Sequence, residues 1–126
     1  MIRLSVIVPV YNLENYISVT LESCLRQDIP SDEYEIICIN DGSADKSEEI
    51  ISQYTEKYPN IRLYTQANAG VSAARNKGID LANGKYIWFV DGDDIIADNC
   101  LKVILSAVEE NDVDILGIGT VCIEFS

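Results

Sequence analysis

The spacing of hydrophobic residues alternates between two periods along this chain, and that alternation constrains the fold more than any other feature. Some segments are nearly continuous apolar runs rich in β-branched and aromatic residues, as in strands covered on both faces. These segments are residues 3–10, 34–39, 61–65 and 85–90. Between them, apolar residues return at helical spacing. Strands that alternate with helices through short links predict an α/β domain with a mostly parallel central sheet.

Helical patterns fill the gaps between the strand-like runs. The first has its apolar stripe at Ile17, Leu21, Cys24 and Leu25. The second is expected to open with a capping box formed by Asp45 and Glu48. The third, residues 71–83, is Ala-rich and is stopped by the pair Asn83-Gly84. A fourth helix follows the last acidic segment.

The end of the chain, residues 114–125, is predicted as a final strand with no polar tail behind it. We find no internal repeat and no flexible linker. The prediction is therefore one domain over residues 1–126, truncated at its C-terminal end.

Composition excludes several classes of function. Nine basic and twenty-one acidic residues give a net charge of −12, which argues against binding nucleic acid or an anionic membrane surface. No apolar run approaches the roughly 20 residues of a membrane span. With no histidine and no C-x-x-C pair, zinc sites and Cys–His or Ser–His catalysis are excluded within this chain. We interpret the cysteines as small buried residues, which predicts a reducing, cytoplasmic location.

Each strand-like run ends in a polar segment. The segments are YNLE at 11–14, NDGSAD at 40–45, NAG at 68–70 and DGDD at 91–94. Ligands of open α/β sheets collect in the crevice outside the carboxyl ends of the strands. The polar segments therefore predict a single binding site.

The acidic segment DGDD suits a divalent cation. In extended backbone Asp91 and Asp93 point to the same side, and Gly92 between them permits close approach. Hard carboxylate oxygens favour Mg²⁺ or Mn²⁺, which commonly bind one or two carboxylates together with substrate phosphates. The alternative is a solvated acidic turn in which Asp94 or Asp98 caps the next helix.

Two further residues are candidates for ligand binding, and each also has a purely structural interpretation. Asp41 ends the second strand-like run and could accept a hydrogen bond from a ring N–H of a base, or belong only to an Asp-Gly turn. Arg75 could grip a phosphate with its guanidinium, or be an exposed charge on a helix.

The combination of segments is more specific than any one of them. VIVPVYN at 6–12, NDGSAD at 40–45, NAGVSAARNKG at 68–78 and GKYIWFVDGDD at 84–94 occur in this order. Together they resemble the nucleotide-sugar-binding half of family-2 inverting glycosyltransferases over almost the whole chain. The resemblance implies the GT-A fold, a Rossmann-like three-layer sandwich. It also implies a UDP-sugar as donor, transferred with inversion to an acceptor hydroxyl on a glycan or lipid-linked acceptor.

The resemblance assigns the nucleoside end of the site first. Pro9, Tyr11 and Glu14 would line the pocket for base and ribose. Asp41 would hydrogen-bond the base, usually uracil.

The diphosphate end is implied in the same way. Arg75 would lie near the diphosphate, and Asp91 beside the ribose and the metal. Asp93 would bind the Mn²⁺ or Mg²⁺ that bridges the diphosphate, and Asp94 would support that site or orient the sugar.

The resemblance also marks what we do not expect within this chain. The family's general base lies well downstream of the D-x-D segment, together with the acceptor-binding region, so we expect these residues alone to be inactive. A location at the inner face of the membrane is compatible with the full-length protein.

Two alternatives are a non-catalytic module that binds UDP or a UDP-sugar, and a D-x-D Mg²⁺-dependent phosphatase. The phosphatase reading is disfavoured because its motif lies on the first strand and is normally followed by Thr or Ser, whereas Ile95 follows here.

Overall fold

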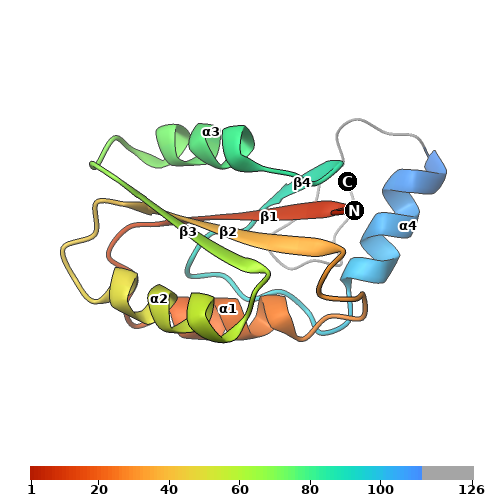
Figure 1. Cartoon of the computed structure of the whole chain (residues 1–126), viewed down its shortest axis with the longest axis horizontal. Helices are drawn as coiled ribbons and strands as arrows, with labels where there is room; N and C mark the ends of the chain where they lie inside the picture. Colours follow the sequence, from red (N-terminus) through yellow and green to blue (C-terminus); the bar gives the residue numbers. More distant parts are fainter. Residues whose placement is uncertain (112–126) are drawn as a thin grey trace.

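The computed structural model describes residues 1–111, in which strands and helices alternate (Figure 1). The elements are β1 (Leu4–Val10), α1 (Ile17–Leu25), β2 (Tyr34–Asp41), α2 (Ser47–Lys57), β3 (Ile61–Gln66), α3 (Val71–Leu81), β4 (Tyr86–Phe89) and α4 (Leu101–Asn111). The strands and helices predicted within these residues are confirmed, with ends that shift by a few positions. The strand predicted at 114–125 lies outside the described residues. No helix of the described part is long and apolar enough to cross a membrane.

The strands within the described residues form one parallel sheet in the order β3-β2-β1-β4. β1 pairs with β2 along its full length and with β4 from Leu4 to Ile7. The chain moves outward from β1 to β3 and then returns to the other side of β1, so the strand order reverses there. The loops that follow β1 and β4 part at this reversal, which is where folds of this kind bind ligands.

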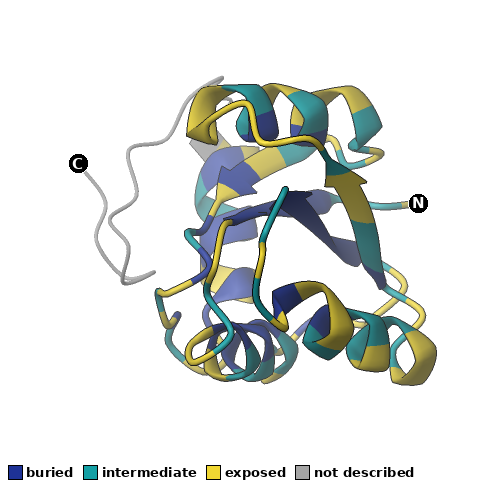
Figure 2. Ribbon diagram, turned by 90° about the vertical axis from the view of Figure 1, so that its left-hand side faces the viewer, coloured by how far each residue is buried: buried dark blue, intermediate teal, exposed yellow. Residues whose placement is uncertain are grey.

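Helices cover both faces of the sheet, so the described residues form three layers. α1 and α2 lie on one face and α3 on the other (Figure 1). Figure 2 shows the buried central strands of the sheet between helices whose outer sides are exposed. The prediction of a three-layer α/β domain with a parallel sheet is confirmed.

Side chains of β1 alternate between the two layers of helices, as strand geometry requires. Val6 and Val8 belong to the larger core shared with α1 and α4. Ile7 points the other way, into a smaller core with Ala74 of α3. Gly78 of α3 lies directly against Ile7, and a Cβ there would collide with the Ile7 side chain. The glycine therefore lets α3 approach β1 closely.

A buried carboxylate fastens the amino ends of the strands, opposite the predicted site. Glu35 of β2 accepts hydrogen bonds from Ser5 Oγ at 2.6 Å, from Arg62 Nη1 at 2.8 Å and from the Asn83 N–H at 2.7 Å. Burial alone would raise the pKa of Glu35, but these bonds outweigh it and hold the pKa below its ordinary value. The charged form of Glu35 therefore joins β1, β2, β3 and the segment before β4.

The predicted capping box is wrong in its details. α2 begins at Ser47 with Lys46 at the N-cap, and the Lys46 side chain makes no capping hydrogen bond. Asp45 instead accepts hydrogen bonds from the N–H groups of Ser47 and Glu14, and Glu48 accepts one from Asn40. The loop after β1 uses the Asp45 carboxylate as an acceptor for the Glu14 N–H. The local sequence around α2 does not indicate this contact.

The interpretation of the cysteines as small buried residues is confirmed for Cys24, Cys38 and Cys100. Cys24 and Cys38 are free and buried. Burial raises the pKa of the Cys24 thiol to about 12 and also raises that of Cys38, so both stay protonated near neutral pH.

Candidate functional site

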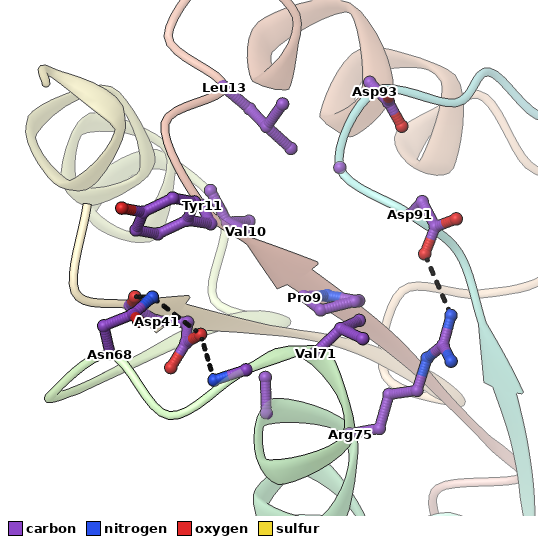
Figure 3. Close-up of a pocket in the computed structure, with 13 residues that line it drawn as sticks. Pro9, Val10, Tyr11, Leu13, Asp41, Asn68, Val71, Arg75, Asp91 and Asp93 are labelled. Carbon is purple, nitrogen blue, oxygen red and sulfur yellow. Dashed lines mark hydrogen bonds and ion pairs between the residues drawn. The ribbon is translucent and has the colours of Figure 1, made fainter.

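A cavity of about 460 Å³ opens at the carboxyl edge of the sheet, where the loops after β1 and β4 part (Figure 3). The ends of β1 and β2, the start of α3 and the segment after β4 contribute its lining. The lining residues are Pro9, Val10, Tyr11, Leu13, Asp41, Asn68, Gly70, Val71, Ala74, Arg75, Asp91, Gly92 and Asp93. Apolar side chains from β1 and α3 thus face polar groups from the loops, as in many small-molecule sites.

Carboxylates gather at one end of the cavity in a tight turn. Oxygen atoms of Asp91, Asp93 and Asp94 all lie within 4.8 Å of one another, and the Asp94 N–H donates to the Asp91 carbonyl at 3.0 Å. Burial and the negative charges of Asp91 and Asp93 raise the pKa of Asp94. Hard oxygens converging at this spacing fit Mg²⁺ or Mn²⁺, since a bound cation would offset their mutual repulsion.

Arg75 reaches this acidic turn from α3. Its Nη2 donates to Asp91 Oδ1 at 3.3 Å (Figure 3), and its guanidinium carbon lies 5.8 Å from the centre of the Phe89 ring. Its Nε is buried and has no hydrogen-bond partner within the described residues. A buried donor without an acceptor is costly, so the geometry favours an additional anionic ligand for Arg75.

Asp41 is engaged by the segment between β3 and α3. Its Oδ1 accepts from Gln66 Nε2 at 3.0 Å and from the Ala69 N–H at 2.9 Å. Its Oδ2 accepts from Asn68 Nδ2 at 3.2 Å and from the Gly70 N–H at 2.9 Å. Burial alone would raise the pKa of Asp41, but these bonds outweigh it and lower that pKa. The carboxylate therefore orders the segment that forms one side of the cavity.

The same segment packs closely on the turn after β2. Gly42 has φ +73°, and a Cβ there would lie 2.7 Å from the backbone nitrogen of Asn68. Only glycine fits this position without strain. The Asp-Gly pair is thus a turn, as one interpretation of the sequence proposed, and its aspartate also faces the cavity.

The loop after β1 is joined to the loop after β2 by reciprocal hydrogen bonds. The N–H groups of residues 12, 13 and 14 donate to the side chains of Ser43, Ser47 and Asp45. In return, the N–H groups of residues 44 and 46 donate to the side chains of Asn12 and Glu14. Asn12 adopts a left-handed conformation with φ 53°, which turns the chain between the two loops.

Most predicted site residues meet in this cavity. Those that line it are Pro9, Tyr11, Asp41, Arg75, Asp91 and Asp93. Asp94 contributes its carboxylate to the acidic turn beside them. In the described part of the chain, Glu14 does not line the cavity, because its carboxylate accepts the N–H of Lys46 at 3.3 Å. A contact of Glu14 with base or ribose stays a prediction.

Some lining residues were not among the predicted ones. Asn68 lies in a polar loop after a strand, and that position was the signal for it. Leu13 and Val71 are apolar and gave no signal, because the cavity needs them only for shape. Thr20 of α1 does not line the cavity and was also missed, although it is a buried polar residue, as Ser23 on the same helix is.

The parallel sheet, the strand reversal at β1 and the acidic turn after β4 define a GT-A domain. The family model described as Glycosyl transferase family 2 matches residues 5–124, so this chain belongs to that family. The resemblance inferred from the four segments is confirmed.

Individual relatives agree with this assignment. The chain is 44% identical over 115 residues to the uncharacterized glycosyltransferase EpsJ of Bacillus subtilis, covering 91% of this chain and 33% of EpsJ. The crystal structure of S. aureus TarS 1–349 in complex with UDP-GlcNAc matches with a TM-score of 0.83 and 34% identity, over 88% of this chain and 32% of that one.

The mannosyltransferase PcManGT from Pyrobaculum calidifontis, in complex with GDP-Man and Mn²⁺, matches with a TM-score of 0.72 and 25% identity. The match covers 85% of this chain and 31% of the PcManGT chain. The chain thus spans about a third of the length of EpsJ and of these solved structures.

Proposed function

We propose that residues 1–126 are the nucleotide-diphospho-sugar-binding domain of a glycosyltransferase, and that they bind a UDP-sugar together with Mn²⁺ or Mg²⁺. In the whole protein, the sugar is transferred with inversion to a hydroxyl of a glycan or lipid-linked acceptor. The observation that carries the proposal is the acidic turn of Asp91, Asp93 and Asp94 beside the guanidinium of Arg75, which contacts Asp91 at the same cavity. Membership of the family and the UDP-GlcNAc complex of TarS support it.

The diphosphate end of the cavity has a plain division of roles. Asp93 and Asp91 would hold the cation, and Asp94 would complete the carboxylate cluster beside them. A bound divalent cation supplies Lewis-acid stabilisation of the leaving diphosphate. Arg75 would use its free Nε–H, and any donor released from Asp91, to bind a phosphate oxygen. The acidic turn alone would repel a diphosphate, so the positive charge of Arg75 is needed at this end.

The nucleoside end is less polar. Pro9 and Tyr11 offer apolar surface, and Tyr11 is 51% exposed at the mouth of the cavity. Asp41 is proposed to meet the base. A bond from a ring N–H to Asp41 would share an oxygen that already accepts N–H groups of residues 66–70.

Transfer requires a general base within hydrogen-bond reach of the attacking hydroxyl. The carboxylates that line the cavity in the described part are Asp41, Asp91 and Asp93, and each already has another role in the proposal. We therefore assign no base within these residues. Binding of the donor is the part of the function that this chain can be tested for.

Isothermal titration with UDP, GDP and uridine, each with and without Mn²⁺, tests the proposal. We expect Mn²⁺ to tighten UDP binding and to leave uridine unchanged, because uridine carries no phosphate. Asp93→Asn should remove the Mn²⁺ effect on UDP and spare uridine. Asp98→Asn is the matched control. Asp98 lies outside the acidic turn, and its exposed carboxylate pairs with Arg26. UDP binding that ignores Mn²⁺ in the unmutated chain would contradict the metal assignment, and tighter binding of GDP would contradict the choice of uridine.

A further inference from the structure

A buried hydroxyl of α1 holds the backbone of the acidic turn. Thr20 Oγ1 donates to the carbonyl oxygen of Gly92 at 2.9 Å, and both residues are buried, Thr20 with 1% of its surface exposed. The hydroxyl has a single proton, and its other acceptor, the Tyr16 carbonyl, lies farther away at 3.4 Å. The shorter bond to Gly92 is therefore the favoured one.

Gly92 is also confined by the end of β1 and the loop that follows it. A Cβ on Gly92 would lie 2.7 Å from Leu13 Cδ1 and 3.1 Å from the carbonyl oxygen of Pro9. The peptide between Asp91 and Asp93 thus lies between α1 and the end of β1. Glycine is required there for space, yet glycine is also the residue whose backbone rotates most freely.

The hydrogen bond from Thr20 restricts rotation of the Gly92 backbone, and this rotation would move the carboxylate of Asp93. The carbonyl of Gly92, the N–H of Asp93 and the Cα of Asp93 belong to one planar peptide unit. Fixing the oxygen of that plane restrains the position of the Asp93 Cα, from which the carboxylate side chain extends. Asp91, Asp93 and Asp94 repel one another, so without such a restraint their mutual repulsion would spread them apart.

Further contacts from α1 and from the residues just after it hold the segment that follows the acidic turn. Ser23 lies three residues beyond Thr20 on α1, and Gln27 follows the C-terminal end of the helix. Ser23 Oγ accepts the Ile96 N–H at 3.2 Å, and Gln27 Oε1 accepts the Leu101 N–H at 3.1 Å. These two contacts hold the later part of the segment. Of the three residues, Thr20 is the one whose hydrogen bond reaches the acidic turn.

We propose that Thr20 is a positioning residue for the cation site: its hydrogen bond to the Gly92 carbonyl orients the Asp93 carboxylate for metal binding. This inference rests on the proposed function, because it needs the acidic turn to bind a divalent cation. Thr20 is too deeply buried to touch a ligand and lies outside the residues that line the cavity. Its effect is on the geometry of the ligand set.

Binding of Mn²⁺ alone, measured by the loss of the electron paramagnetic resonance signal of the free ion, tests the inference. Thr20→Val keeps the shape of the side chain and removes the hydroxyl. We expect its Mn²⁺ affinity to fall about tenfold, the scale reported for loss of groups that orient metal ligands. Thr20→Ser keeps the hydroxyl and should stay within about twofold of the unmutated chain on the same scale. Uridine affinity should be unchanged in both variants.

Thr55→Val is the matched control. Thr55 is also a helical threonine whose hydroxyl donates to a backbone carbonyl, that of Ser52 at 2.8 Å, but it lies on α2 away from the acidic turn. Its Mn²⁺ affinity should equal that of the unmutated chain. If Thr20→Val fails to show a cooperative melting transition, Thr20→Cys replaces it, because the thiol is a weaker donor of similar size. Its Mn²⁺ affinity should then lie below that of Thr20→Ser.

The outcomes separate the inference from the proposed function. Undiminished Mn²⁺ affinity in Thr20→Val, or in Thr20→Cys where that variant is needed, overturns the role of Thr20 and leaves the cation site standing. Equal losses in Thr20→Val and Thr20→Ser also overturn it, because the hydroxyl would then be irrelevant. No Mn²⁺ binding by the unmutated chain overturns both.

Discussion

Replacing Asp41 by asparagine tests how the cavity is built. The carboxylate accepts hydrogen bonds on both oxygens, from Gln66, Asn68 and the N–H groups of Ala69 and Gly70. Asparagine keeps the size of the side chain but turns one acceptor into an NH₂ group that faces other donors. Hydrogen bonds to a charged group contribute roughly 1.5–3 kcal/mol each, and relaxation recovers part of that loss. We expect the free energy of unfolding at pH 7 to fall by about 2–4 kcal/mol.

The pH dependence of this effect has a definite sign. The pKa of Asp41 in the folded chain lies below its ordinary value of 3.8, because the hydrogen bonds outweigh the effect of burial. Its contribution to stability is therefore complete above that ordinary value and is lost as the pH falls through the lower folded pKa. The difference between the unmutated chain and Asp41→Asn should be constant near neutrality and shrink in acid below pH ~4.

Urea denaturation across this pH range measures both effects. Asp80→Asn is the control: Asp80 is exposed on α3, and its carboxylate makes no hydrogen bond or ion pair within residues 1–111. Its stability should match that of the unmutated chain to within about 0.5 kcal/mol. If Asp41→Asn were as stable as Asp80→Asn at pH 7, Asp41 could not hold the segment between β3 and α3. A difference that persisted unchanged into acid would mean that the charge of Asp41 plays no part.

Three further predictions follow from the same geometry. Arg75→Met should weaken UDP binding about tenfold and spare uridine in isothermal titration, since one charge-assisted bond to phosphate is lost; equal losses for both ligands would place Arg75 at the nucleoside. Glu35→Gln should lower the free energy of unfolding by about 2–3 kcal/mol in urea without changing UDP affinity, because its bonds lie at the opposite edge of the sheet. Gly42→Ala should destabilise the chain more than Gly70→Ala in the same assay, since both have positive φ but only Gly42 meets a neighbour, Asn68, within 4 Å; the reverse order would contradict the close approach.

The fold was accessible from the sequence because burial on both faces leaves a simple pattern. β1 and β2 read as continuous apolar runs, and every residue of both strands is buried. The ends of strands and helices were predicted less accurately. β2 continues through Asn40 and Asp41, two residues past the predicted end. Parallel pairing with β1 and β3 carries those polar residues into the strand, and single-sequence patterns do not report pairing partners.

The site was predictable in composition but less so in its contacts. Asp91, Asp93 and Arg75 follow from their positions at strand ends and on the helix after β3, and the structure brings them together. The bonds of Asp41 to residues 66–70, and of Thr20 to Gly92, join positions 25–29 and 72 residues apart. Such pairings depend on how the layers pack, so no local pattern in the sequence indicates them.

The reciprocal bonds between the loops after β1 and β2 also bear on how this region can evolve. Each backbone N–H of residues 12–14 relies on an oxygen of Ser43, Ser47 or Asp45, and the N–H groups of 44 and 46 rely on Asn12 and Glu14. A substitution that removes one of these oxygens leaves a backbone N–H of the other loop without its protein acceptor. Among homologous sequences, these five positions should accept only side chains with an acceptor oxygen, or change together across the two loops. Neighbouring positions such as 15 and 16, which carry no such obligation, should vary freely.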